Sequence, residues 1–108
     1  MKINILGAEW DLEFSNYFVD ERLKDYAGYT DDTVRKIVVD TGEGRSICEN
    51  YEHYRKQTIR HEIIHAYMYE SGLSDSWEHK TGQDETTVDW FAVQFPKLLK
   101  TFQEADAL

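Results

Sequence analysis

"RHEIIHAYMYESG", residues 60–72, is the stretch that decides how this chain is interpreted. It carries His61 and His65 four positions apart, with Glu62 directly after the first histidine. On a helix, residues i and i+4 lie one turn apart on the same face, so both imidazoles point to one place. The pattern therefore poses a choice between a helix that binds a metal ion and a helix that carries two structural histidines.

A helix is predicted around this motif, because apolar residues recur at close to helical spacing from residue 51 to residue 67. Asn50 can cap its start, and Gly72 can adopt the left-handed conformation after its end. The two histidines thus lie on a segment that predicts a helix independently of them.

A second helix is predicted after "TGQD", residues 81–84, which resembles a capping box, and it runs through residues 85–95. Pro96 has no backbone N–H and should end or kink this helix near Gln94. Residues 97–108 then predict a helical continuation that frays at the C-terminus.

The first forty residues predict strands. The segment "EWDLEFSN" (9–16) alternates apolar and polar residues, and "RKIVVDT" (35–41) is rich in β-branched residues. Between them, "YAGYTDDTV" (26–34) has the turn chemistry of a hairpin, "VDERLKDY" (19–26) favours a short helix, and "KINIL" (2–6) adds a further strand. The predicted fold class is α+β, with a small, mainly antiparallel N-terminal sheet packed on the histidine-bearing helix and a C-terminal helix.

Composition limits the classes of function. The 108 residues are 41% hydrophobic, which suits a single domain over residues 1–108. The net charge of −9 argues against a nucleic-acid backbone or an anionic membrane as partner, because both are polyanions. The lone Cys48 can form neither an internal disulfide nor a thiolate zinc site by itself. With no apolar run near 18 residues and no secretory signal, the expected location is the cytoplasm.

Zinc is the metal that this pattern favours. Two neutral imidazoles suit Zn²⁺, which accepts nitrogen and oxygen donors in tetrahedral geometry. Glu62 lies about 100° around the helix from His61, near enough to touch a water on the metal, which is where a general base belongs. A catalytic zinc has three protein ligands and an open position, so the third ligand must come from elsewhere. The candidates that follow the helix are Glu78, His79 and Glu85.

The segment "ETTVD", residues 85–89, offers both a ligand and its support. Glu85 and Asp89 lie one turn apart on the second predicted helix. Glu85 could bind the metal, while Asp89 accepts the free N–H of a ligating histidine and fixes its tautomer. The competing interpretation of "DETTVD" is an acidic first turn that complements the helix dipole.

"HEIIH" followed twenty positions later by "ETTVD" resembles the gluzincin metallopeptidases in order and spacing. More closely, residues 58–95 resemble small single-domain zincin proteins of phages and prophages, related to ImmA/IrrE-type peptidases and to minigluzincins. The resemblance extends weakly to "GYTDDTVRKIVV" (28–39), which is similar to the sheet that precedes the zinc helix in those families. It implies a zincin-like fold with His61, His65 and Glu85 as zinc ligands, Glu62 as base and Asp89 behind a ligand.

SprT-like proteins provide a competing zincin type, in which a third histidine completes the site. His79 lies fourteen positions after His65 and fits that scheme. SprT-like proteins usually act on or near DNA, however, and this chain is strongly acidic. If Glu85 is the third ligand, His79 can instead donate a hydrogen bond to the reacting oxyanion or lie on a surface loop.

The expected function is peptide-bond hydrolysis on a protein or peptide substrate, with Glu62 as general base on a zinc-bound water. The edge of the sheet could pair with an extended peptide, and "TVRKIVVDT" (33–41) is the predicted edge strand. Three rivals remain: a zinc-binding regulatory or interaction module without catalysis, a metal-free structural protein of a phage, and a DNA-associated protease. Thermolysin-like enzymes build much of their cleft from a second domain, for which this chain has no room. Tyrosines such as Tyr54, Tyr67 and Tyr69 could supply phenols in its place.

Overall fold

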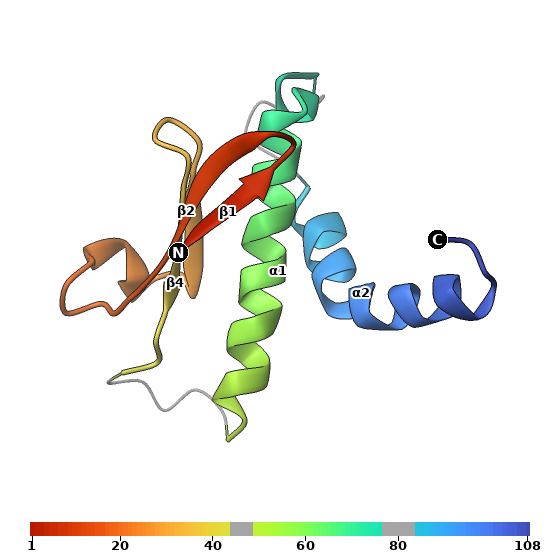
Figure 1. The fold of residues 1–108 in the computed structure, drawn as a ribbon. Coiled ribbons are helices and arrows are strands. Elements are labelled where there is room, and N and C mark those ends of the chain that lie inside the picture. The colour runs from red at the N-terminus through yellow and green to blue at the C-terminus, as the bar shows by residue number, and fades with distance from the viewer. Residues whose placement is uncertain (44–48, 77–83) are drawn as a thin grey trace.

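A computed structural model describes residues 1–43, 49–76 and 84–108 of the chain. Three layers lie side by side in Figure 1: a four-stranded sheet, the long helix α1 (Tyr51–Glu70) and the helix α2 (Glu85–Glu104). Helix α1 lies between the other two layers, so it contacts both the sheet and α2. This middle position allows one helix to present side chains to the sheet and to the later helix at once.

The sheet combines two antiparallel pairs with one parallel pair. Its strands are β1 (Lys2–Ile5), β2 (Ala8–Ser15), β3 (Gly28–Asp31) and β4 (Lys36–Asp40), in the order β1-β2-β4-β3. β1 pairs with β2 and β3 with β4 in antiparallel fashion, whereas β2 and β4 are parallel. The predicted strands and the predicted hairpin are confirmed, and the sheet is mixed.

The predicted edge strand is wrong. β4, which contains most of residues 33–41, lies between β2 and β3, and its residues 37–40 are all buried. The edge on that side is β3, the first strand of the hairpin. A hairpin pattern predicts that two strands pair but not which of them faces outward, because the second neighbour of β4 comes from a distant part of the sequence.

The core forms between the sheet and α1. Trp10 and Leu12 from β2 and Ile37 and Val39 from β4 are buried together with Ala66 of α1. Burying several such side chains contributes about 1.5–3 kcal/mol each. The face of α1 that carries Ala66 is therefore fixed against the sheet. This sets the rotation of the helix about its axis, and so the direction in which its other faces point.

Helix α1 begins and ends where its sequence predicts. The side chain of Asn50 accepts a hydrogen bond from the backbone N–H of His53 at 3.1 Å, and Gly72 has a φ of +80° after the last turn. The short helix predicted before the hairpin is a 3-10 helix, Glu21–Lys24, and a further 3-10 turn, Leu73–Ser76, follows α1.

Helix α2 is one continuous helix through Pro96, so the predicted end near Gln94 is wrong. The ribbon of α2 bends along its length in Figure 1, which fits the alternative of a kink, and the predicted continuation past residue 97 is confirmed. Asp84 caps the helix by accepting from the backbone N–H of Thr86. Residues 81–83 of the predicted capping box lie outside the described residues.

The architecture is thus α+β, as predicted, with two α-helices and a small mixed sheet in the described part of the chain. Neither of these two helices has the length and apolar character needed to span a bilayer.

Candidate metal centre

His61 and His65 lie on a face of α1 beside the one that packs on the sheet. Their Nε2 atoms are 3.1 Å apart, and the rings meet edge to face with centroids 4.8 Å apart. One turn of helix thus brings two imidazole nitrogens to a single point, as the spacing predicts.

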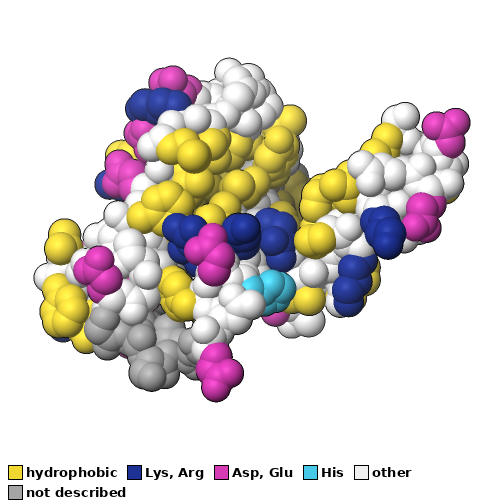
Figure 2. All heavy atoms as spheres, turned by 60° about the horizontal axis from the view of Figure 1, so that its bottom comes forward, with side chains coloured by type: hydrophobic (Ala, Val, Ile, Leu, Met, Phe, Trp, Pro, Cys, Tyr) yellow, Lys and Arg dark blue, Asp and Glu magenta, His cyan; other side chains and the backbone are white. Residues whose placement is uncertain are grey.

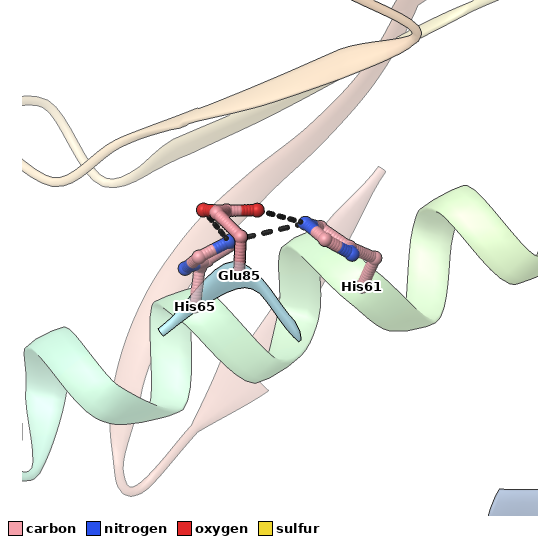
Figure 3. Close-up of side chains that lie close together, drawn as sticks. All are labelled: His61, His65 and Glu85. Atoms are coloured by element: carbon pink, nitrogen blue, oxygen red, sulfur yellow. Dashed lines mark hydrogen bonds and ion pairs between the residues drawn. The ribbon is translucent and has the colours of Figure 1, made fainter. Parts of the chain in front are cut away.

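Glu85, the first residue of α2, points its carboxylate at the same two nitrogens (Figure 3). Its Oε2 lies 3.0 Å from Nε2 of His61, and its Oε1 lies 2.9 Å from Nε2 of His65. The Asp84 cap fixes where α2 begins and therefore where Glu85 stands. One ligand atom from each of the three residues lies within 4.8 Å of the others.

These residues fit a tetrahedral zinc ion. Three ligand atoms bound to zinc at about 2.1 Å are about 3.4 Å apart, which is close to the distances of 2.9–3.1 Å between the two nitrogens and from each nitrogen to a carboxylate oxygen. Without a cation, three hydrogen bonds cannot all form with single ring protons. A hydrogen bond between the two histidines leaves one Nε2 as acceptor, and that atom cannot also donate to Glu85. Two nitrogen lone pairs and a carboxylate facing one point are the donor set that zinc prefers.

Asp89 lies behind His61. Its Oδ1 is 3.4 Å from Nδ1 of His61, one helical turn after Glu85. A carboxylate there favours the tautomer with the proton on Nδ1, and this leaves Nε2 as a ligand atom. The structure therefore places Asp89 where the predicted supporting role requires it.

Glu62 is buried beside this triangle. Its residue surface is only 6% exposed, and among the described residues its Oε2 has no hydrogen-bond partner. Burial, with a smaller contribution from the charge of Glu85, raises the pKa of Glu62 to about 7, although the nearby Thr30 hydroxyl opposes this rise. A carboxyl group with a pKa near neutrality can both take up and release a proton at physiological pH.

His65 is also held in its neutral form. Burial lowers its pKa, and the nearby His61 lowers it further, while Glu85 opposes both effects. A neutral imidazole is the form that binds a metal.

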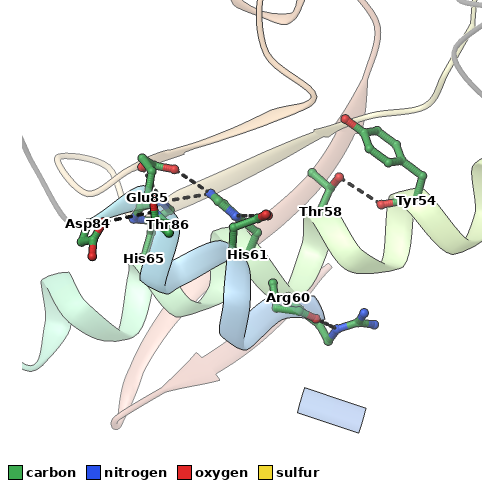
Figure 4. A network of polar contacts seen from close by, with 10 residues as sticks. Tyr54, Thr58, Arg60, His61, His65, Asp84, Glu85 and Thr86 are labelled. Carbon is green, nitrogen blue, oxygen red and sulfur yellow. Dashed lines mark hydrogen bonds and ion pairs between the residues drawn. The ribbon is translucent and has the colours of Figure 1, made fainter. Parts of the chain in front are cut away.

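Helix α2 is tied to α1 next to the site by Arg60. Its Nε donates to the backbone carbonyl of Ala92 at 2.6 Å (Figure 4). In a regular helix the residue four positions later would donate to that carbonyl, but here that residue is Pro96, which has no N–H. Arg60 thus satisfies the acceptor that proline leaves unpaired, and it joins the two helices one residue before His61.

Two adjoining cavities open beside the triangle. One, of about 260 Å³, lies between β3 and the ligands and is lined by Thr30, Tyr69 and Glu85. The other, of about 200 Å³, lies towards the start of α1 and is lined by Tyr54 and Asp89. Tyr26, Gly28, His61 and Glu62 line both. Together the two cavities form a groove along the edge strand, with Glu62 at its centre.

Gly28 permits the close approach of β3 to α1. A Cβ atom there would lie 2.9 Å from the carbonyl oxygen of Val38 and 3.1 Å from Cγ2 of Thr58. The Thr30 hydroxyl donates to the backbone carbonyl of Glu62 at 3.1 Å, which ties β3 to α1 at the site. The sequence marked Gly28 as a turn residue, and its role as a spacer depends on packing that no local pattern reveals.

The phenols divide between two faces. Tyr69 and Tyr54 line the cavities, whereas Tyr67 lies on the apolar surface between α1 and α2. Burial raises the pKa of Tyr69, so its hydroxyl stays protonated and able to donate. Tyr26, just before β3, was not marked by any sequence pattern. His79, Glu78 and Cys48 lie outside the described residues.

Comparison with family models, with curated proteins and with solved structures found no match in any of the three. The arguments that follow rest on the residues and their geometry.

Proposed function

We propose that this chain is a small single-domain zinc metallopeptidase of the gluzincin or minigluzincin type, related to the ImmA/IrrE-like and phage zincin proteins. The observation that carries the proposal is the convergence of His61, His65 and Glu85 on one point beside a buried carboxyl group. If the two histidines were only structural, nothing would require a carboxylate from a second helix to meet them at the same point.

His61, His65 and Glu85 would hold the ion, and Asp89 would orient His61. A bound zinc ion supplies Lewis-acid chemistry, since it lowers the pKa of water towards ~7 and polarises a carbonyl oxygen. Every other part of the mechanism falls to side chains and backbone of this chain.

Glu62 moves the proton. The Glu62 carboxyl lines both cavities of the groove, where it can accept a proton from a water and then pass that proton to the amine that leaves. Burial raises the pKa of Glu62, and this makes its carboxylate a stronger base than an exposed one. Tyr69 lines the same cavity as Glu62, and this supports a role for its hydroxyl as a donor to the oxygen of the reacting carbonyl.

An extended peptide is the substrate that suits the groove. β3 is an edge strand, so one side of its backbone has no neighbouring strand in the described sheet. A peptide can add to such an edge by main-chain hydrogen bonds, which are tolerant of sequence. The groove along β3 would then carry the peptide past Glu62.

Cleavage of a mixed peptide library by zinc-loaded protein, read by mass spectrometry, tests the proposal. We expect cleavage by the natural chain and none by Glu62→Gln, with equal zinc content in both. Loss of zinc together with activity in Glu62→Gln would show that Glu62 is structural and would contradict its role as base.

A zinc-binding module without catalysis is the second candidate function. It is favoured by the exposure of Glu85, whose side chain is 68% exposed, because an open ligand excludes little water from the site. Full zinc occupancy with no cleavage of any library peptide would decide for this candidate.

A further inference from the structure

The outer half of helix α2 carries an apolar stripe that has no cover within the described structure. Val88 and Ala92, on the inner half, are fully buried against the body. The same stripe continues at helical spacing to Phe95, Leu99 and Phe102, which are 47%, 36% and 45% exposed. We call this outer half, residues 95–104, the arm.

The arm projects from the body. In Figure 1 it runs away from the sheet and from α1, and in Figure 2 it stands apart as a narrow extension. Hydrophobic side chains and the Lys and Arg side chains occupy different sides of this extension in Figure 2. A solvated helix would carry polar groups on all sides, so the one-sided pattern indicates a surface that another element covers.

A matching apolar groove lies where the arm leaves the body. It is about 500 Å³ in volume and is lined by Leu6 from the β1–β2 turn, by Ile64, Tyr67 and Met68 from α1, and by Leu73. Phe91 and Phe95 of α2 close its other side. We call this the docking groove. It lies on a different face of α1 from the groove along β3, and the two grooves share no lining residue.

We infer that the docking groove of one copy receives the arm of a second copy, and that the exchange is reciprocal about a two-fold axis. Suppose that two α2 helices cross in antiparallel fashion and that the two-fold axis passes midway between Phe95 and Leu98. Each residue then faces the residue of the other copy whose number brings the sum of the two to 193. Phe102 of each copy then lies opposite Phe91 of the other, at the docking groove. A two-fold interface uses the same patch on both copies, so stripe and groove can satisfy each other.

Charge favours this contact over others. Residues 90–103 contain Lys97 and Lys100 and no Asp or Glu, in a chain of net charge −9. Two copies repel each other over most of their surface, and this repulsion is smallest where the carboxylates are absent.

The available area is that of a small specific dimer. The exposed apolar side chains of the arm and the docking groove are each 36–60% exposed. At about 200 Å² for a large side chain, they offer about 600 Å² per copy and about 1,200 Å² in total. That total lies at the lower end of the range for specific complexes, so we expect a dimer with a dissociation constant in the micromolar range.

The dimer does not depend on zinc or on catalysis, so it stands or falls separately from the proposed function. Sedimentation velocity over a concentration series tests it on the whole chain. We expect the species to shift from the mass of one chain, 12.8 kDa, to twice that mass as concentration rises. Phe102→Asp in the arm and Leu73→Asp in the groove should each raise the dissociation constant at least roughly tenfold.

The matched control is Thr101→Asp, which adds the same charge to the arm at a residue outside the apolar stripe. It should leave the dimer unchanged. Circular dichroism checks that each variant is folded, and the substituted side chains are exposed, so folding should persist.

Mixing the two disruptive variants provides the sharpest readout. The Leu73→Asp chain keeps an intact arm, and the Phe102→Asp chain keeps an intact groove, so an equimolar mixture retains one good contact per pair. We expect the mixture to form more dimer than either variant alone. A natural chain that stays monomeric over the concentration series would overturn the inference, and so would a monomer that sediments with neutral lipid vesicles. A mixture that forms no more dimer than either variant alone would also overturn it.

Discussion

The two helices that meet at the candidate metal centre hold their ligands in different ways. On α1, the side chains of His65 and His61 are 7% and 20% exposed, and the helix behind them packs on the sheet. On α2, the side chains of Glu85 and Asp89 are 68% and 61% exposed. The difference indicates that α1 holds the two histidine nitrogens in place before a metal binds. The position of the third ligand, Glu85, depends instead on how α2 is held.

Helix α2 is held on the body by packing and by a hydrogen bond. Val88 and Ala92 are buried against the body, and Arg60 bonds the carbonyl that Pro96 leaves without a donor. The account therefore predicts large losses when the α1 side is changed and graded losses when the α2 side or its attachment is changed.

Replacing His65 should cause the largest loss. His65→Ala removes a buried nitrogen from the pair, and we expect zinc affinity to fall roughly a thousandfold, as for losing about a third of a typical structural zinc binding energy. Competition with a zinc-binding dye measures it. The control is His53→Ala, on the exposed start of the same helix, which should bind zinc normally. Equal losses in both variants would contradict the assignment.

Glu62→Gln should stabilise the metal-free protein at pH 8. The pKa of Glu62 is about 7 in the folded chain and about 4.5 when unfolded, so the folded state holds its proton more tightly. Stability is therefore lost as pH rises from about 4.5 to about 7, by up to about 3 kcal/mol. Removing the carboxylate removes this penalty.

Urea unfolding of metal-free protein at pH 4.5 and at pH 8 checks the sign of this effect. The gain from Glu62→Gln should be large at pH 8 and small at pH 4.5. A gain that is the same at both values would mean that burial does not perturb Glu62.

Loosening α2 should have an intermediate effect. Arg60→Met keeps the unbranched stem of the side chain as far as the position of Nε but leaves the Ala92 carbonyl without that donor, so we expect zinc affinity to fall roughly tenfold. Adding Pro96→Ala supplies the backbone N–H that the helix lacks and should recover part of the loss. If the second substitution makes no difference, proline and arginine are not linked as described.

The smallest effect should come from the carboxylate behind His61. Asp89→Asn keeps the shape but weakens the hold on Nδ1, for which a loss of about tenfold or less in zinc affinity is expected. The distance of 3.4 Å and the exposure of Asp89 place the effect at the low end. Glu104→Gln, at the far end of the same helix, is the control for the change of charge.

Local patterns in the sequence predicted the parts of the structure that depend on local physics. The helical spacing of His61 and His65, the Asn50 cap and Gly72 each follow from neighbouring residues, and the structure confirms them. The separation of Glu85 from Asp89 likewise predicts that the two carboxylates lie one turn apart on the same face of the second helix.

The parts that the sequence did not predict depend on distant partners. The place of β4 inside the sheet requires the parallel pairing with β2, and the burial of Glu62 requires β3 to lie over it. The carbonyl that Pro96 leaves without a helical donor is satisfied by Arg60, which lies more than thirty residues earlier. No pattern within one helix or strand carries such information.

The zinc content of the purified, untreated chain tests the central claim most directly. Elemental analysis should find about one zinc per chain in the natural protein and far less in Glu85→Ala, while His79→Ala should keep its zinc. Absence of zinc from the natural chain, or retention by Glu85→Ala with loss from His79→Ala, would contradict the centre of two histidines and Glu85.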